Sequence, residues 1–111
     1  MECELRRNRI RSGCVDECLR AWLDQVPALR RSFGFELVGA WFADGSGELV
    51  WILGYQGPDG FDAADARYYA SAERAALDPD PAQWFESNEA VRMRPLPLAE
   101  SHGATSEPLD P

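Results

Sequence analysis

Lysine is absent from this 111-residue chain, and its single histidine, His102, stands close to the C-terminus. Without a lysine amine the protein has no group for a Schiff base or pyridoxal phosphate and no Walker-type phosphate grip. A triad built on histidine would depend on His102 alone, and a metal site of several histidines is excluded. The glycines form no phosphate-binding pattern either, so we expect no cofactor.

Long apolar runs are also missing. The stretch LVWIL at residues 49–53 is typical in length and is far shorter than the roughly 20 residues that cross a bilayer. The first residues include Glu2, Glu4 and several arginines, where a secretory signal would need an unbroken apolar segment. We therefore expect a cytoplasmic protein with no membrane partner.

Basic residues are outnumbered, 11 against 19 acidic ones, which gives a formal net charge of −8. Proteins that bind nucleic acids usually present a basic face to the phosphates, so no nucleic-acid partner is expected. The apolar content of 45% is typical of a folded globular chain, and the length suits one domain.

Cysteines are few and odd in number: Cys3, Cys14 and Cys18. An odd set without an export signal gives little support to a disulfide framework. Cys14 and Cys18 are four residues apart on a predicted helix, and a three-thiolate site for Cu(I) or Zn(II) is one alternative. Because Cys18 falls on the apolar face of that helix, burial in the core is the favoured interpretation.

The best-marked element is a helix that follows Gly13. Apolar residues recur there at the three- and four-residue spacing of one helix face, at Val15, Cys18, Leu19, Trp22, Val26 and Leu29. Acidic residues in its first turn and arginines in its last suit the helix dipole, and Gly34 ends it.

The remaining pattern predicts four strands and a second helix. Residues 3–10 form a first strand, and residues 35–43 and 48–55 form a hairpin around the turn DGSG. Asp62 is the expected N-cap of a helix that runs to about Leu77, and residues 89–96 form the last strand. The domain then covers residues 1–98, and residues 99–111 are expected to be disordered.

This β-α-β-β-α-β order predicts an α+β, ferredoxin-like fold, a four-stranded antiparallel sheet with both helices on one face. The hairpin is apolar on both sides, since Trp41 alternates with Phe42 and Trp51 with Ile52. Two helices cover only one face, and an exposed apolar sheet is rarely tolerated. A homodimer with sheets packed face to face is the simplest solution.

Several segments resemble the NIPSNAP family, which belongs to the dimeric α+β barrel superfamily with small monooxygenases and EthD-like proteins. The similarity runs from about residue 2 to residue 97. The segments, in order, are ELR at 4–6, Gly13, FELVGAW at 35–41, VWILGY at 50–55, RYY at 67–69, DP at 78–79 and MRPL at 93–96. The resemblance implies the dimeric barrel but little chemistry, because many relatives have no assigned activity.

Aromatic residues indicate where a ligand would bind. The candidate residues of a cleft between helices and sheet are Trp41, Trp51, Tyr55, Arg67, Tyr68 and Trp84. Indole and phenol rings suit a small hydrophobic or aromatic organic molecule, although the favoured interpretation of the rings themselves is that they fill a core and a dimer interface. On the second helix, Tyr68 is expected to line the cleft while Arg67 or Tyr69 stands at its edge.

Two functions remain open at this stage. In the first, the protein binds or transforms a small organic molecule in the cleft. In the second, it is a non-catalytic interaction or regulatory module that dimerises and displays a surface, which the absence of lysine and the presence of a single histidine favour.

Overall fold

The computed structural model describes residues 1–99. Its elements, in order, are β1 (Glu2–Ile10), α1 (Val15–Ser32), β2 (Glu36–Ala43), β3 (Glu48–Tyr55), α2 (Phe61–Tyr69), α3 (Ala72–Ala75), the 3-10 helix η1 (Pro81–Trp84) and β4 (Phe85–Met93). The predicted β-α-β-β-α-β order is confirmed. His102 and all of the expected disordered tail except residue 99 lie outside the described residues.

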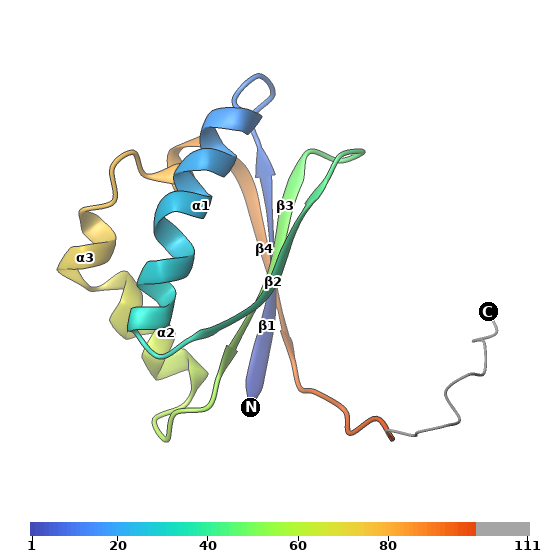
Figure 1. Ribbon diagram of the computed structural model, residues 1–111, viewed down its shortest axis with the longest axis vertical. Coiled ribbons are helices and arrows are strands. Elements are labelled where there is room, and N and C mark those ends of the chain that lie inside the picture. The colour runs from blue at the N-terminus through green and yellow to red at the C-terminus, as the bar shows by residue number, and fades with distance from the viewer. Residues whose placement is uncertain (100–111) are drawn as a thin grey trace.

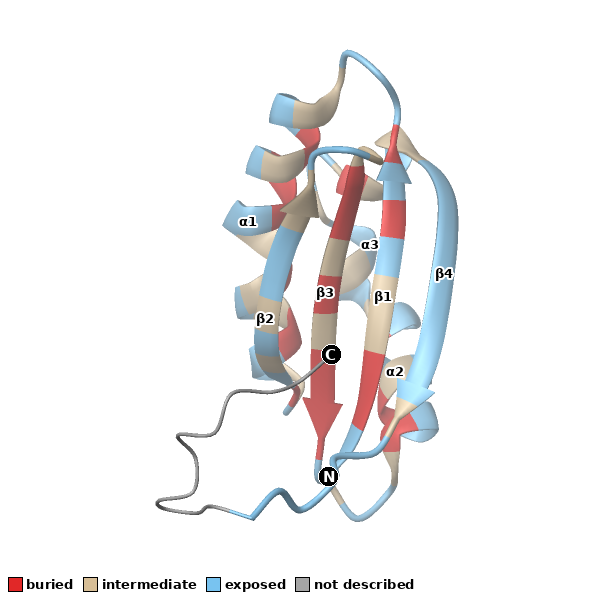
Figure 2. Cartoon of the chain, turned by 90° about the vertical axis from the view of Figure 1, so that its right-hand side faces the viewer, coloured by how far each residue is buried: buried red, intermediate tan, exposed pale blue. Residues whose placement is uncertain are grey.

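The four strands form one sheet in the order β2-β3-β1-β4, and every neighbouring pair is antiparallel. All the helices lie against one face of this sheet (Figure 1), and the other face is uncovered by any helix (Figure 2). The predicted ferredoxin-like fold is thus confirmed. Among the described residues, no helix combines the length and apolarity needed to cross a bilayer.

The core lies between α1, α2 and the covered face of β3. Alternate residues of a strand share a face, so β3 turns Leu49, Trp51, Leu53 and Tyr55 toward the helices. Cys18, Trp22 and Val26 of helix α1 are buried and pack in the same core. The intervening residues of β3 face the other way, onto the sheet's uncovered side.

The second helix is shorter than its pattern predicted. It ends at Tyr69 because the Ser71 side chain accepts a hydrogen bond from the Arg74 backbone N–H at 3.0 Å and so begins the separate helix α3. Gly60, with φ at +86°, precedes α2 where Asp62 was expected as the cap. Asp62 instead accepts a hydrogen bond from Arg92 at 2.6 Å.

The last strand begins earlier than predicted, at Phe85 rather than Glu89, and ends at Met93. Phe85, Ser87 and Asn88 pair with β1 although most of residues 85–88 are polar, so their composition concealed the strand. Two prolines, Pro95 and Pro97, follow its end and provide no N–H for further pairing.

Tyr68 provides a test of this core. Its ring is 1% exposed, packs edge-on against Phe33 at 5.4 Å and lies 3.7 Å from the Arg30 guanidinium carbon. We expect Tyr68→Ala to lower the free energy of unfolding by about 3–5 kcal/mol in urea titrations, because it empties a filled site. Tyr68→Phe keeps the ring and should cost less than about 1.5 kcal/mol. Equal midpoints for Tyr68→Ala and the wild type would show that this ring does not support the core.

Candidate functional site

A cavity of about 480 Å³ opens between the covered face of the sheet and the helices α2 and α3. This volume lies in the range of small-molecule sites, roughly 300–1,000 Å³. Strands β1, β3 and β4 provide one side, and α2, α3 and η1 the other. Its lining residues are Glu4, Arg6, Asn8, Trp51, Asp65, Tyr69, Arg74, Ala82, Phe85, Asn88, Glu89 and Ala90.

The polar side of the cavity begins on β1. Glu4, Arg6 and Asn8 are alternate residues of this strand, so all three point to the covered face of the sheet. They lie between the apolar side chains of β3 and the polar residues Asn88 and Arg92 of β4 on the same face. This polar stripe positions the rest of the site.

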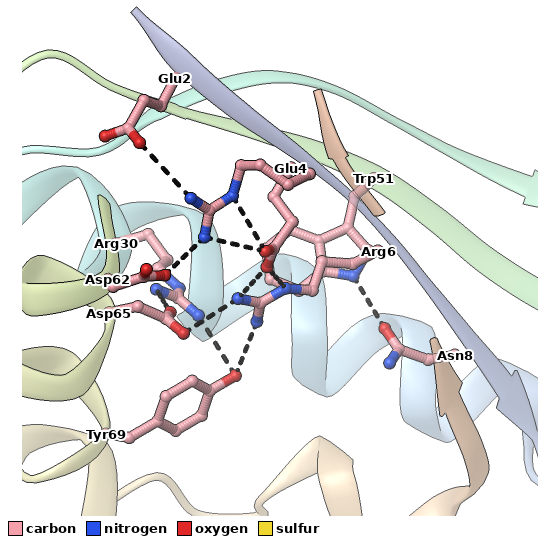
Figure 3. Close-up of polar contacts among 10 residues, drawn as sticks. Glu2, Glu4, Arg6, Asn8, Arg30, Trp51, Asp62, Asp65 and Tyr69 are labelled. Atoms are coloured by element: carbon pink, nitrogen blue, oxygen red, sulfur yellow. Dashed lines mark hydrogen bonds and ion pairs between the residues drawn. The ribbon is translucent and has the colours of Figure 1, made fainter. Parts of the chain in front are cut away.

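Arg6 and Arg30 converge on the same two partners (Figure 3). Arg6 donates to Asp65 Oδ2 at 3.1 Å and to the Tyr69 hydroxyl oxygen at 3.0 Å. Arg30, from α1, donates to Asp65 Oδ1 at 2.8 Å and to the same Tyr69 oxygen at 3.2 Å. Two guanidinium groups therefore fix one carboxylate and one phenol, which orients Tyr69 at the cavity wall.

Arg30 is the most deeply buried charge of the site, with no exposed surface. Asp65 pairs with it, and the faces of Tyr68 and Phe35 lie 3.7 and 4.7 Å from its guanidinium carbon. Aromatic faces attract a cation, and the attraction grows when water is excluded. Arg30 thus joins the aromatic core to the polar network.

A second carboxylate, Glu4, links Arg6 to the end of β4. One of its oxygens accepts from Arg6 Nε at 2.6 Å, and the other accepts from Arg92 at 3.3 Å. Burial lowers the pKa of Arg6, but nearby Tyr69, Asp65 and Glu4 outweigh it and raise this pKa above its ordinary value. Arg6 therefore stays charged throughout the pH range of the folded protein.

Two asparagine side chains hold Trp51 in place on the sheet side of the cavity. The Trp51 indole N–H donates to Asn8 Oδ1 at 2.8 Å, and Asn8 Nδ2 donates in turn to Asn88 Oδ1 at 2.7 Å. The Trp51 ring also packs edge-on against Trp22, with centroids 5.2 Å apart. The indole is consequently held in one orientation at the edge of the cavity.

Of the six residues predicted for the cleft, the structure brings only Trp51 to this cavity. Tyr68 is enclosed in the core beneath α2. Trp41 is 56% exposed on the uncovered face of the sheet, and Trp84 lines a surface groove beside α1. The six candidates therefore do not form one site.

Tyr55 and Arg67 form a separate surface cluster with Asp59. The Tyr55 hydroxyl donates to Asp59 Oδ1 at 2.7 Å, and Arg67 donates to Asp59 Oδ2 at 2.7 Å and to the Tyr55 oxygen at 3.3 Å. These hydrogen bonds, from Tyr55 and then Arg67, lower the pKa of Asp59. The cluster fastens the loop before α2 and contributes nothing to the cavity lining.

Arg6 and Asp65 were missed as site residues and Tyr69 was expected only as one alternative at the edge of the cleft, although the sequence carries one signal for these residues. The alternation Glu4, Arg6, Asn8 places three polar side chains on one face of a strand. A polar stripe of this kind within an apolar sheet needs partners on the covering helices. Helix periodicity predicted Tyr68 as the residue that lines the cleft, whereas it is the neighbouring Tyr69 that points to that stripe.

The cysteines are free thiols, and Cys18 is fully buried with its sulfur 3.6 Å from the Pro81 carbonyl oxygen. Burial, and then the nearby Cys14, raise the pKa of Cys18 to about 11. No cluster of three or more potential metal-ligating side chains occurs within residues 1–99. The position of Cys18 agrees with a role in packing.

Thiol reactivity tests this assignment. At pH 8 a thiol with a pKa near 11 carries almost no thiolate, and burial also blocks access, so Cys18 should react with Ellman's reagent only after unfolding. The partly exposed Cys14 should react first, and Cys14→Ser should remove this fast phase. Rapid labelling of Cys18 in the folded protein, located by mass spectrometry, would contradict its burial.

Neither a protein-family model nor a curated protein matches this chain by sequence. Solved structures do match it. A NIPSNAP domain protein from Burkholderia xenovorans superposes with a TM-score of 0.77 at 24% identity, over 91% of this chain and 100% of that one. A NIPSNAP family protein of unknown function from Agrobacterium tumefaciens gives a TM-score of 0.77 at 26% identity, over 89% and 91% of the two chains.

An antibiotic biosynthesis monooxygenase shares the fold at a lower TM-score of 0.65 and 18% identity, over 87% of this chain and 100% of that one. The resemblance that the sequence segments indicated is thereby confirmed: the chain is NIPSNAP-like, with the ferredoxin-like fold that NIPSNAP proteins share with this monooxygenase.

Proposed function

We propose that the protein binds, or transforms, a small hydrophobic or aromatic organic molecule in the cavity between the sheet and helices α2 and α3. The observation that carries this proposal is the mixed lining of a cavity of about 480 Å³. Trp51, Phe85, Ala82 and Ala90 supply apolar surface, and Tyr69 supplies a phenol on the facing wall. Ligand sites typically combine a largely apolar lining with a few placed polar groups.

The fixed position of these groups supports the proposal. Tyr69 is oriented by two guanidiniums and Trp51 by the Asn8 amide, before any ligand arrives. Binding groups that are already ordered lose little conformational entropy when a ligand binds. A purely structural core gains nothing from polar side chains arranged around open space.

One structural neighbour, an antibiotic biosynthesis monooxygenase, is in keeping with small-molecule chemistry. Free cysteines are typical of a reducing compartment, and we propose that the protein is cytoplasmic.

The uncovered face of the sheet supports a homodimer as the working form. Leu5 of β1 pairs with Ile52 of β3 and with Val91 of β4, so the three form an apolar row across this face. Val91 is 46% exposed, and Trp41 at the sheet edge is 56% exposed. A second copy of the chain, presenting the same face, would cover these side chains through a twofold interface.

This face also gives the alternative function its support. A module that dimerises or binds another protein would use the same apolar row and would leave the cavity empty of any ligand. The two functions differ in what they require of Trp51 and Tyr69, because only ligand binding needs groups that face open space.

Ligand binding can be followed at the Trp51 indole N–H. We expect 2-naphthol, a flat probe of suitable size, to shift this resonance in nitrogen-15 spectra, with the signal assigned by its loss in Trp51→Phe. Ala82→Leu should weaken binding about tenfold or more, the equivalent of ~1.4 kcal/mol, because the larger side chain enters the cavity. Ala66→Leu, on the exposed side of α2, is the matched control. Saturation without any shift at Trp51 would place the probe elsewhere and contradict the proposal.

The dimer can be tested by light scattering at micromolar concentration. We expect a mass of about twice the 12.4 kDa of one chain. Ile52→Glu, which puts a charge at the centre of the apolar row, should give a folded monomer with unchanged far-ultraviolet circular dichroism. Ala66→Glu should leave the mass unchanged. A wild-type mass of one chain would refute the homodimer.

A further inference from the structure

We infer that the ligand of this cavity is a hydrogen-bond acceptor, a flat organic acid whose carboxylate lies between Tyr69, Arg74 and Asn88. This inference rests on the proposed function, since it specifies the ligand of the same cavity. It follows from counting which polar atoms of the lining are already used by the protein.

The carboxylates of the lining are already engaged. Both oxygens of Asp65 accept from arginines, one from Arg6 and one from Arg30. Both oxygens of Glu4 do the same, with Arg6 and Arg92 as donors. The third acid, Glu89, belongs by register to the uncovered face, where it pairs with Arg7 at 3.2 Å. These acids therefore leave no unpaired carboxylate for a cationic ligand.

The amide oxygens are engaged as well. Asn8 Oδ1 accepts from Trp51 at 2.8 Å, and Asn88 Oδ1 accepts from Asn8 at 2.7 Å. The chain of donors ends at Asn88, whose Nδ2 has no partner among the described residues. Asn88 thus has an unpaired N–H₂ group for a further contact, whereas its carbonyl oxygen already accepts one hydrogen bond.

The Tyr69 hydroxyl also has only a hydrogen-bond donor left for a ligand. Its hydroxyl oxygen accepts from two guanidiniums, Arg6 at 3.0 Å and Arg30 at 3.2 Å. A phenol has one O–H donor and at most two acceptor positions, so the O–H is the group that remains for a ligand. Tyr69 can therefore donate to a molecule in the cavity but has no acceptor position left for it.

Arg74 adds a positive charge to these donors. It lies on α3 with its side chain only 17% exposed, and one Nη donates to Asp80 at 3.0 Å. Its Nε and its other Nη have no hydrogen-bond partner within residues 1–99. The guanidinium carbon lies 5.6 Å from the centre of the Tyr69 ring, so the two residues line the same part of the wall.

The consequence is a cavity whose unused side-chain polar groups donate hydrogen bonds, beside the apolar surface of Trp51 and Phe85. Each carboxylate and amide oxygen that lines the cavity from the covered face already accepts at least one hydrogen bond from the protein, so a ligand that donates, or carries a positive charge, must share an acceptor. A carboxylate offers two acceptor oxygens to Tyr69, Arg74 and Asn88, and hydrogen bonds to charged groups are the stronger kind. The flat body of the acid then lies on the apolar part.

Three probes with the same ring system separate the possibilities: 2-naphthoate, 2-naphthylmethylammonium and 2-methylnaphthalene. Titrations are followed at the Trp51 indole N–H, as above. We expect 2-naphthoate to bind at least about tenfold more tightly than either of the others. Equal affinities for all three, or tighter binding of the ammonium compound, would overturn the inference while leaving the cavity as a ligand site.

Failure of the proposed function has a different signature: none of the three probes shifts Trp51, and the inference about the ligand falls with it. Arg74→Gln should lower the affinity for 2-naphthoate about tenfold and leave the affinity for 2-methylnaphthalene unchanged. Tyr69→Phe, which keeps the ring and removes the donor, is the second variant and should act in the same direction. A preference that survives both substitutions would show that these donors do not recognise the carboxylate.

Discussion

The structure depends on one carboxylate shared by two arginines. Asp65 of α2 accepts from Arg6 of β1 and from Arg30 of α1, so a single side chain ties both main helices to the sheet. Arg30 is fully buried, and loss of one partner from a buried ion pair typically costs about 3–5 kcal/mol. The position of α2 over the sheet is therefore set by charge pairing as well as by apolar packing.

This arrangement explains why the cavity exists. Glu4, Arg6 and Asn8 line the cavity from β1, and Arg6 reaches across to Asp65 and Tyr69 of α2, so polar contacts take the place of apolar packing between this strand and the helix. The same contacts orient Tyr69, which lines the cavity. Its neighbour in the sequence, Tyr68, is buried in the core. Fold and candidate site thus share one set of interactions.

The fold could be predicted from the sequence because its signals are local. Apolar spacing marked α1, glycines marked the hairpin turn, and the order of elements then allowed few topologies. The site was harder to predict, because its residues come from β1, β3, β4, α2, α3 and η1 and meet only through the sheet register and the packing of the helices on the sheet. The prediction of Tyr68 in place of Tyr69 shows the limit of helix periodicity. The periodicity identifies the buried face of a helix, but it does not show which adjacent residue contacts the polar side chains of a strand.

We propose that the cavity beside the Asp65 network binds a flat organic acid. The most direct measurement is a crystal structure of the wild-type protein grown with 2-naphthoate. The account predicts density for the ring system beside Trp51 and Phe85, with the carboxylate within hydrogen-bond distance of Tyr69, Arg74 and Asn88. A cavity closed by these side chains, or 2-naphthoate bound only at another surface, would contradict it.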